Sequence, residues 1–177
     1  MSLEHISKQL TALEGKLPPV EQWDPPYCGE MSMEIKADGS WFYMGTVISR
    51  ERLVKLFSTV LKKENNDYFL VTPVEKIKLT VITEPFVITH WRWLDDVTPP
   101  TIELTTNIGD KLLLDNEHRL EINKDGRLKV RVRRNLYASI HRNVFYQWAE
   151  LAEIVDDKKN QHLVISSAGV NHVLGAI

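Results

Sequence analysis

The chain contains 177 residues, with 22 basic and 24 acidic side chains and a formal net charge of −2. This composition is typical of a globular protein, and it excludes a disordered chain, a collagen-like repeat and a strongly basic nucleic-acid binder. The single cysteine, Cys28, excludes an intramolecular disulfide and fits a reducing compartment. A chain of this length forms one domain or two small ones, and it needs no metal or disulfide to fold.

The first 17 residues carry one apolar stripe at three- and four-residue spacing. This stripe predicts a helix over residues 3–17 that ends before Pro18–Pro19, and the helix either covers the core or packs on a partner chain. Glu4 and Glu14 interrupt the segment, which excludes a secretory signal or transit peptide. No stretch approaches the roughly 18 apolar residues that span a bilayer. We therefore expect a cytoplasmic protein.

The first half of the chain predicts a loop, a hairpin, a helix and two further strands. Asp38–Gly39 is the dipeptide that a tight hairpin turn prefers, and Ser49 is placed to cap the helix. In chain order the expected elements are a loop over Val20–Gly29, strands over Met31–Lys36 and Trp41–Met44, a helix over Arg50–Lys63, and strands over Tyr68–Thr72 and Val74–Ile82.

After Pro85 the pattern becomes almost entirely β. Turn signals separate six expected strands: Phe86–Leu94, Thr101–Thr106, Lys111–Asp115, Arg119–Ile122, Leu128–Arg134 and Leu136–His141. A second amphipathic helix over Arg142–Val155 follows, and then two short apolar segments, His162–Ile165 and Val170–Leu174. So many short strands predict a strongly bent antiparallel sheet.

The two halves share an order of elements, which indicates an internal duplication. In each half a hairpin with Asp–Gly at its turn is followed by an expected helix that begins with an arginine, and then by a strand. The hairpin turns are Asp38–Gly39 and Asp125–Gly126, and the helices begin at Arg50 and Arg142. The sequence therefore predicts an α+β protein of two related subdomains, 1–84 with the leading helix and 85–177. A crevice between two such units is a favoured place for a small ligand.

The motifs of common enzymes and metal sites are absent. The six histidines show no HxH or HExxH spacing, and the chain has no GxSxG elbow, P-loop or GxGxxG. Asp115, Glu117 and His118 lie close together, but a polar turn explains them as well as a metal site does. We therefore predict no catalytic residues, no metal and no cofactor, with the enzyme question left open.

The run from Lys129 to Arg134 is the most unusual local feature. On a strand, Lys129, Arg131 and Arg133 share one face, which is either a solvated face or a site for phosphate or carboxylate. Tyr137 and Tyr146 nearby could stack on a nucleotide. A nucleic-acid groove is disfavoured because the run is short and the net charge is slightly acidic.

Two smaller motifs also allow two interpretations. Asn107–Asp110 is either a plain hairpin turn or a backbone nest for an anion. Glu75 and Lys76, which we expect where the first unit joins the second, are either an exposed ion pair or part of a ligand site.

Many spaced landmarks from Pro18 to Leu174 resemble the bacterial proteins of the domain of unknown function 1285. They are Trp23–Pro25 with Gly29, Asp38–Trp41 with Tyr43 and Gly45, Ile48–Arg50 with Leu53–Val54 and Leu56–Phe57, Leu70–Lys76, Pro85–Phe86, Thr106–Asp110, Val132–Arg133, Leu136, Ala138, Ile140, Arg142 and Phe145–Tyr146. The chain departs from the family pattern near Arg134–Asn135 and in its final stretch.

The resemblance implies two related α+β subdomains, the second similar to a pleckstrin-homology fold, in which a C-terminal helix closes a bent antiparallel sheet. It also implies a non-enzymatic binding protein with a nucleotide-type ligand between the subdomains and a role in signalling. On this basis the first hypothesis is a module that binds an anionic small molecule. The residues expected to bind it are Arg133, Arg142, Tyr146, Asn107, Asp110, Arg131, Glu75 and Lys76.

Two alternatives stay open. One is a protein-interaction scaffold, in which the N-terminal helix or a sheet edge binds a partner or forms a homo-oligomer. The other is an enzyme, which requires a cleft that brings together two titratable groups such as Asp115 and His118. Neither nucleic acid nor a membrane span is expected.

Overall fold

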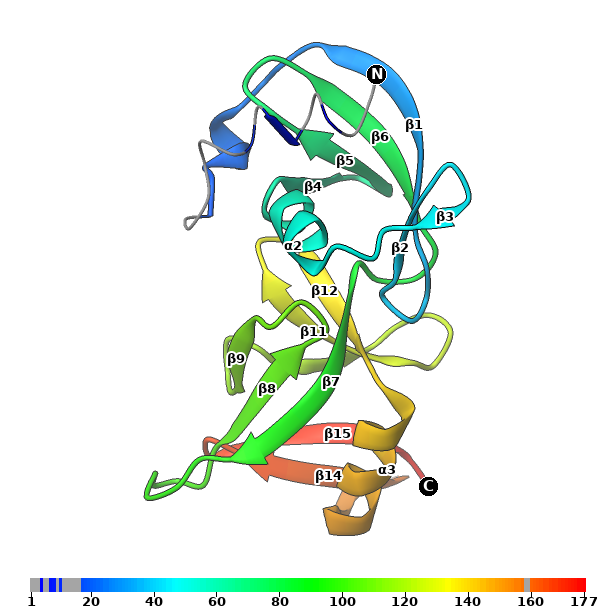
Figure 1. Ribbon diagram of the computed structural model, residues 1–177. Coiled ribbons are helices and arrows are strands. Elements are labelled where there is room, and N and C mark those ends of the chain that lie inside the picture. Colours follow the sequence, from blue (N-terminus) through cyan, green and yellow to red (C-terminus); the bar gives the residue numbers. More distant parts are fainter. Residues whose placement is uncertain (1–3, 5–6, 9, 11–16, 158–159) are drawn as a thin grey trace. The chain divides into compact units, whose positions relative to one another are not determined.

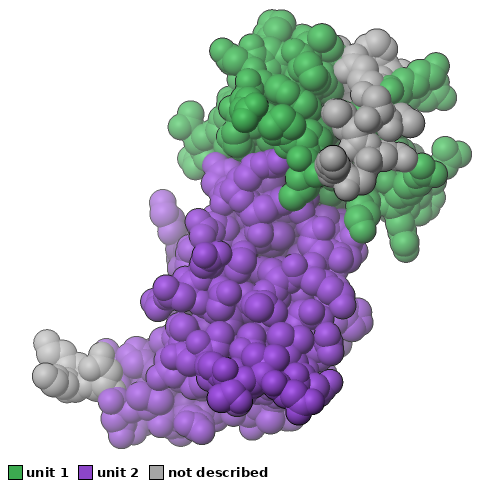
Figure 2. Space-filling model, turned by 90° about the vertical axis from the view of Figure 1, so that its left-hand side faces the viewer, with its two compact units in different colours: residues 1–85 green, residues 86–177 purple. Residues whose placement is uncertain are grey.

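The computed structural model describes residues 4, 7, 8, 10, 17–157 and 160–177. The helix expected over residues 3–17 falls largely outside the described residues. The chain divides into two compact units, Met1–Pro85 and Phe86–Ile177, here called unit 1 and unit 2 (Figure 2). No helix among the described residues is long and apolar enough to cross a membrane.

Unit 1 is one curved sheet with a helix on one face (Figure 1). Its described elements are the 3₁₀ turn η1 (Val20–Gln22), helix α2 (Glu51–Thr59) and strands β1 (Tyr27–Ile35), β2 (Trp41–Tyr43), β3 (Thr46–Val47), β4 (Leu61–Glu64), β5 (Asp67–Val71) and β6 (Lys76–Val81). The strand order is β3-β2-β1-β6-β5-β4. All neighbours are antiparallel except β1 and β6, which pair in parallel.

The core of unit 1 lies between α2 and the sheet. Alternation along the strands turns one set of side chains toward the helix, where the ring of Trp41 stacks on Phe57 with centroids 6.4 Å apart. Both rings are fully buried. The other fully buried core residues of the described chain in this unit are Leu10, Val20, Met33, Ile35, Val60, Leu61, Leu70 and Val71.

Helix α2 is shorter than predicted at both ends. The prediction that Ser49 caps the helix is wrong. Arg50 occupies the N-cap position, and its side chain makes no capping hydrogen bond. The helix ends at Thr59, and the apolar residues that continued the helical pattern enter strand β4, where Leu61 pairs with Leu70. Pairing with β5 outweighs the helical period there because it buries Leu61 completely.

Unit 2 contains a six-stranded sheet, a helix and a separate three-stranded sheet within the described residues. Its elements are β7 (Phe86–Trp93), β8 (Ile102–Thr106), β9 (Lys111–Leu114), β10 (Leu120–Ile122), β11 (Leu128–Arg133), β12 (Leu136–Ile140), α3 (Arg142–Leu151), β13 (Glu153–Asp157), β14 (Asn160–Ser167) and β15 (Val170–Ala176). The large sheet has the order β10-β11-β12-β7-β8-β9, and the small one has β13-β14-β15.

The structure confirms the six strands predicted between Phe86 and His141, and it differs from the predicted outline in two ways. Strand β12 pairs with β7 in parallel, so the sheet is not antiparallel throughout. Helix α3 ends at Leu151 rather than Val155, and strands β13 to β15 follow it, so no helix closes the unit at its C-terminal end. The β-branched pair Ile154–Val155 favours the extended strand that pairs with β14.

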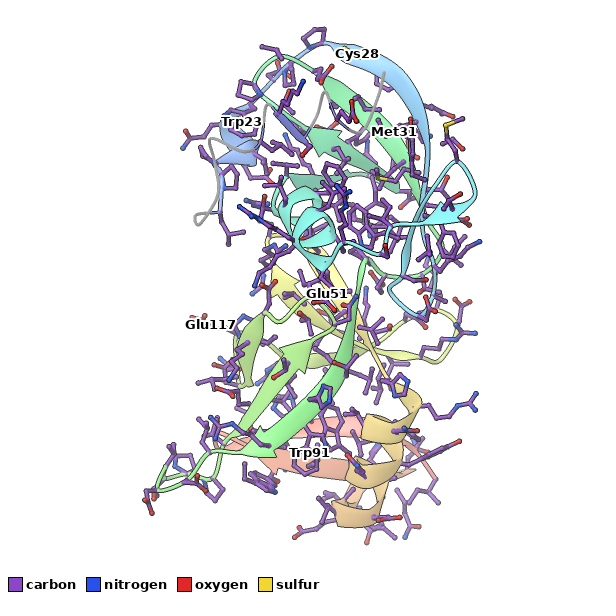
Figure 3. All side chains as sticks on the ribbon, viewed as in Figure 1. Trp23, Cys28, Met31, Glu51, Trp91 and Glu117 are labelled. Carbon is purple, nitrogen blue, oxygen red and sulfur yellow. The ribbon has the colours of Figure 1, made fainter. Side chains whose placement is uncertain are left out.

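Two contacts fix the small sheet and α3 within unit 2. The buried hydroxyl of Ser167 donates to Leu114 O at 2.6 Å and accepts from Ile102 N at 2.9 Å, so it inserts between the ends of β8 and β9. The Trp91 side chain lies on the α3 side of β7 (Figure 3), where its Nε1–H donates to Gln147 Oε1 at 2.8 Å. Both contacts join elements far apart in sequence.

The order helix, strand, strand, strand occurs once in each unit. Helix α2 is followed by β4, β5 and β6, and helix α3 by β13, β14 and β15, and each later element starts 91 to 94 residues after its earlier counterpart (142 − 51, 153 − 61, 160 − 67, 170 − 76). The sheets differ, however. Strand β6 completes the sheet of unit 1 by pairing with β1, whereas β15 pairs only with β14 among the described strands.

Candidate functional site

A cavity of about 650 Å³ lies in unit 1, beside the start of helix α2. Two described residues of the N-terminal segment, the β2–β3 hairpin and the first turns of α2 form its walls. The lining residues are Glu4, Ser7, Tyr43, Thr46, Val47, Ile48, Ser49, Arg50, Arg52, Leu53 and Leu56. The volume falls within the roughly 300–1,000 Å³ of typical small-molecule sites.

Local backbone geometry brings these residues together. Met44 and Gly45, both with positive φ, form a two-residue turn that places Tyr43 opposite Thr46. Ile48 N then donates to Trp41 O at 2.7 Å, which directs the chain from β3 into α2. The hairpin and the helix are therefore held as adjacent walls.

The cavity combines an apolar floor with charged side chains. Leu53 and Leu56 project from α2, and Leu56 is buried. Arg50 and Arg52 carry two positive charges into the lining, against one negative charge from Glu4. Arg50 is exposed and forms no ion pair with another described residue. Such a lining can bury an apolar body and pair with an anionic group.

Arg133 and Asp110, both expected to bind the ligand, bind each other in the structure. Their side chains form an ion pair, and the Arg133 guanidinium lies 4.7 Å from the centroid of the Phe86 ring. Only 11% of the Arg133 side chain is exposed. This arginine joins β11, the β8–β9 turn and the start of β7, which is a structural role.

The Asn107–Asp110 segment is a hairpin turn, as the simpler interpretation predicted. Asn107 Oδ1 accepts from Val87 N at 3.0 Å, and Asn107 N donates back to Val87 O at 2.8 Å. The N–H groups of Gly109 and Asp110 both donate to Thr106. Three of the four N–H groups of the turn are therefore used within unit 2, which leaves no nest for an anion.

Arg142 and Tyr146 lie apart from Arg133, whereas Arg131 precedes it by two residues on the same strand. Arg131 is exposed, and its Nη2 donates to Glu117 O at 3.0 Å. Arg142 begins α3 and Tyr146 is one turn later, with 57% of it exposed. Arg133 pairs with Leu136, the first residue of β12, whereas Arg142 comes two residues after the last one, so the length of that strand separates the two arginines. The expected ligand residues of unit 2 therefore do not form one site.

Glu75 lies in the turn between β5 and β6, and Lys76 begins β6. Both are inside unit 1, so the expectation that they lie where the first unit joins the second is wrong. They also do not form an exposed ion pair. Glu75 is buried in a turn that Thr72 closes, with Thr72 N donating to Glu75 O at 2.9 Å. Lys76 Nζ pairs with Glu64 Oε2 at 2.8 Å, and this contact is the main cause that lowers the pKa of Glu64.

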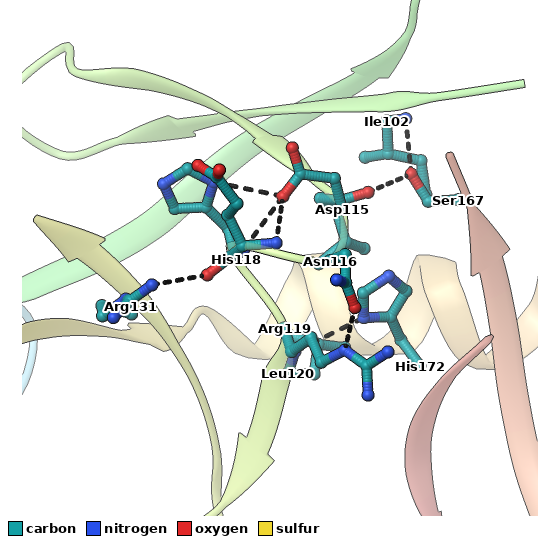
Figure 4. A network of polar contacts seen from close by, with 11 residues as sticks. Ile102, Asp115, Asn116, His118, Arg119, Leu120, Arg131, Ser167 and His172 are labelled. Atoms are coloured by element: carbon teal, nitrogen blue, oxygen red, sulfur yellow. Dashed lines mark hydrogen bonds and ion pairs between the residues drawn. The ribbon is translucent and has the colours of Figure 1, made fainter. Parts of the chain in front are cut away.

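Asp115 and His118 form a local turn rather than a cleft (Figure 4). Asp115 Oδ1 accepts from Glu117 N and His118 N at 2.9 Å each, and lies 3.3 Å from His118 Nδ1. Burial is the largest influence on Asp115 and opposes its ionisation, but these hydrogen bonds together leave its pKa below the usual value. Neither residue lines either cavity. The described residues contain no cluster of three His, Cys, Asp or Glu side chains that could hold a metal.

Reasoning from charge and spacing missed the lining of the unit 1 cavity. The signal was nevertheless present, because six of the lining residues are landmarks of the family resemblance: Tyr43, Ile48, Ser49, Arg50, Leu53 and Leu56. Charge pointed instead to the denser run of arginines in β11 as the ligand site. The sequence spacing does not show that one of them, Arg133, is already paired with Asp110.

Comparisons with known proteins agree on one family. Residues 18–83 match the model described as domain of unknown function (DUF1285), N-terminal domain, and residues 85–174 match its C-terminal domain. A DUF1285 family protein from Silicibacter pomeroyi DSS-3 has a similar structure, with a TM-score of 0.86, 31% identity and coverage of 99% of this chain and 96% of that one.

A second DUF1285 family structure, from Shewanella baltica OS155, shares part of the fold. Its TM-score is 0.55 at 24% identity, and it covers 68% of this chain and 91% of its own. A search of curated proteins found no match.

Proposed function

The chain belongs to the DUF1285 family, and from that premise we propose that it is a non-enzymatic module that binds an anionic, nucleotide-like small molecule and acts in signal transduction. The observation that supports this proposal is the unit 1 cavity. Its volume of about 650 Å³ suits a nucleotide-sized ligand. The proposal places the ligand there rather than at Arg133 and Asp110, because those two side chains are paired with each other.

The lining supplies the groups that such a ligand needs. Leu53 and Leu56 offer an apolar surface, and the ring of the lining residue Tyr43 can stack on a planar base. A guanidinium from Arg50 can bind a phosphate or carboxylate through two parallel hydrogen bonds. Because Arg50 is the N-cap of α2, its charge adds to the positive end of that helix.

Other expectations remain part of the proposal. The exposed free thiol of Cys28 favours a reducing compartment such as the cytoplasm. The pleckstrin-homology-like fold expected for unit 2 rests on the family resemblance. An interaction scaffold is the second candidate function, and a groove in unit 2 beside Trp93, Leu151 and Glu153 favours it. An enzyme is the weakest alternative, because Asp115 and His118 form a turn outside both cavities.

A thermal-shift titration with ATP, GTP, cyclic AMP and inorganic phosphate tests the proposal. A ligand at 100 times its Kd adds about 2.7 kcal/mol to the free energy of unfolding, which raises Tm by roughly 5–10 °C in a chain of this size. Arg50→Gln should weaken the response at least tenfold in ligand concentration, and Leu53→Trp should abolish it by filling the cavity. Lys55→Gln, on the exposed face of the same helix, is the matched control.

Three results would contradict the proposal. One is the absence of any Tm increase with these anions. Another is an equal loss of response in Lys55→Gln and Arg50→Gln. The third is a response that Arg133→Met abolishes while Arg50→Gln leaves it intact, because this would return the ligand to the arginine run of β11.

A further inference from the structure

A second cavity, a groove of about 420 Å³, lies in unit 2 where the β7–β8 loop, the end of α3 and the small sheet meet. The residues that line it are Trp93, Pro99, Pro100, Leu151, Glu153, Val164, Ile165, Ser166, Ser167 and Gly169. No sequence motif pointed to this surface, and it shares no residue with the unit 1 cavity.

An open segment of strand edge forms one wall of the groove. Strand β13 begins at Glu153, which pairs with Val164, so β14 extends beyond β13 by the three residues Ile165–Ser167. On their other side these residues pair with β15. Among the described strands, none pairs with residues 165–167 on the side of β13.

The alternation of the antiparallel ladder decides which backbone groups face this open edge. Ala168 and Gly169 form a two-residue turn with positive φ at both positions, so Ser167 and Val170 are a hydrogen-bonded pair. Ser166 is then a non-hydrogen-bonded position toward β15. Its N–H and C=O point the other way, into the groove, and are free to bond an added strand.

The other walls are apolar and exposed. Trp93 is 39% exposed and Leu151 is 53% exposed, although both are large apolar side chains. The Trp93 ring packs edge-to-face against Trp91, with centroids 6.1 Å apart. Pro99 and Pro100 complete a wall that can receive an aliphatic or aromatic side chain.

The charge around the groove is negative. Glu153 lines it and is exposed, and Asp95 and Asp96 follow Trp93 in the β7–β8 loop. The nearby Arg92 is already paired, with its Nε 2.9 Å from Glu103 Oε1. The groove therefore favours a cationic partner, and an arginine there can pair with Glu153 and stack on the Trp93 face. A second copy of this chain would bring acidic groups together, which disfavours self-association through this face.

We propose that this groove is a docking site for an extended segment of a partner protein that carries an arginine or lysine next to an apolar residue. The segment adds to the open edge of β14 through the N–H and C=O of Ser166. Its apolar side chain lies against Trp93 and Leu151, and its basic side chain meets Glu153. This interaction surface is independent of the unit 1 cavity.

Selection of a random seven-residue peptide library on the full-length chain tests this inference. Peptides enriched on the native chain should carry a basic residue adjacent to an aromatic or aliphatic one. The Kd of a selected, synthesised peptide should rise at least tenfold with Trp93→Ala and with Glu153→Lys. It should stay within twofold with Glu150→Lys, an exposed acidic residue of α3 outside the groove. Binding should also slow hydrogen exchange at the Ser166 amide.

Several results would overturn the inference. These are a lack of enrichment over the Trp93→Ala chain, enrichment of acidic peptides, or equal loss of binding in Glu150→Lys and Glu153→Lys. A doubling of the mass in sedimentation that Leu151→Glu reverses would also overturn it, because the groove would then be occupied by a second copy. Circular dichroism spectra that match the native chain ensure that Trp93→Ala and Leu151→Glu remain folded, and Glu153→Lys changes only an exposed side chain.

Discussion

His172 makes the stability of unit 2 depend on pH. It lies on β15 and is 2% exposed, and its Nδ1 accepts a hydrogen bond from Leu120 N at 3.4 Å (Figure 4). Burial, followed by the positive charge of Arg119, lowers the pKa of His172 from 6.5 to about 4, against smaller opposing effects of Asp115 and Ser167. The folded protein therefore keeps this ring neutral under conditions in which the unfolded chain protonates it.

The size of the effect follows from proton linkage. Because the pKa of His172 is lower in the folded state, the unfolded state binds more protons between pH 4 and 6.5, and stability falls as the pH decreases through that window. The full difference corresponds to about 3 kcal/mol, and about 2 kcal/mol of it is lost between pH 7 and pH 5. Most carboxylates remain ionised above pH 5, so they contribute little to this interval.

Urea unfolding followed by tryptophan fluorescence at pH 7 and pH 5 measures this loss. His172→Asn keeps an oxygen acceptor for Leu120 N but cannot be protonated, so about 2 kcal/mol of the pH dependence should disappear. His90→Asn, at an exposed position on β7, should leave the dependence unchanged. The reasoning is refuted if His172→Asn retains the native slope, or if the ring resonances of His172 titrate near pH 6.5 in the folded protein.

Three further substitutions test contacts within unit 2. Ser167→Ala removes a buried hydroxyl that bonds two backbone groups, and should lower the free energy of unfolding by about 1–3 kcal/mol in urea titrations; a change under 0.5 kcal/mol would show that water replaces it. Arg133→Met should lower the free energy of unfolding by about 2 kcal/mol, because it leaves Asp110 without its partner. The control Arg131→Met, on the same strand, should lower it by less than about 0.5 kcal/mol. Equal losses in the two variants would contradict the structural role of Arg133. Asn107→Ala should cost about 1–2 kcal/mol and speed hydrogen exchange at the amide of Val87, which loses its acceptor; unchanged exchange would contradict the bond.

The strands of unit 2 could be predicted from the sequence because their signals are local. Alternation along Leu128–Arg133 appears directly as alternating burial, and turn residues mark each strand end. The helices were predicted too long for a physical reason. Leu61 and Val155 fit a helical stripe and a strand equally well, and only the neighbouring strands β5 and β14 decide between the two.

The candidate site was harder to predict because it depends on contacts between distant residues. A run of arginines on one strand face looks like an anion site, but Arg133 is 23 positions from the carboxylate that pairs with it. No spacing rule identifies that partnership. The parallel pairing of β12 with β7 is equally long-range, and the residues between them give no local sign of it.

The hydroxyl of Ser167 has a consequence for how unit 2 moves. The hydroxyl lies between β8 and β9, and its own residue belongs to β14, so separation of β14 from the larger sheet removes two hydrogen bonds from the end of the β8–β9 ladder. Opening of the small sheet therefore weakens that end of the ladder and favours its fraying. A partner that holds β14 in place would therefore also stabilise the end of β9, an edge strand of the six-stranded sheet.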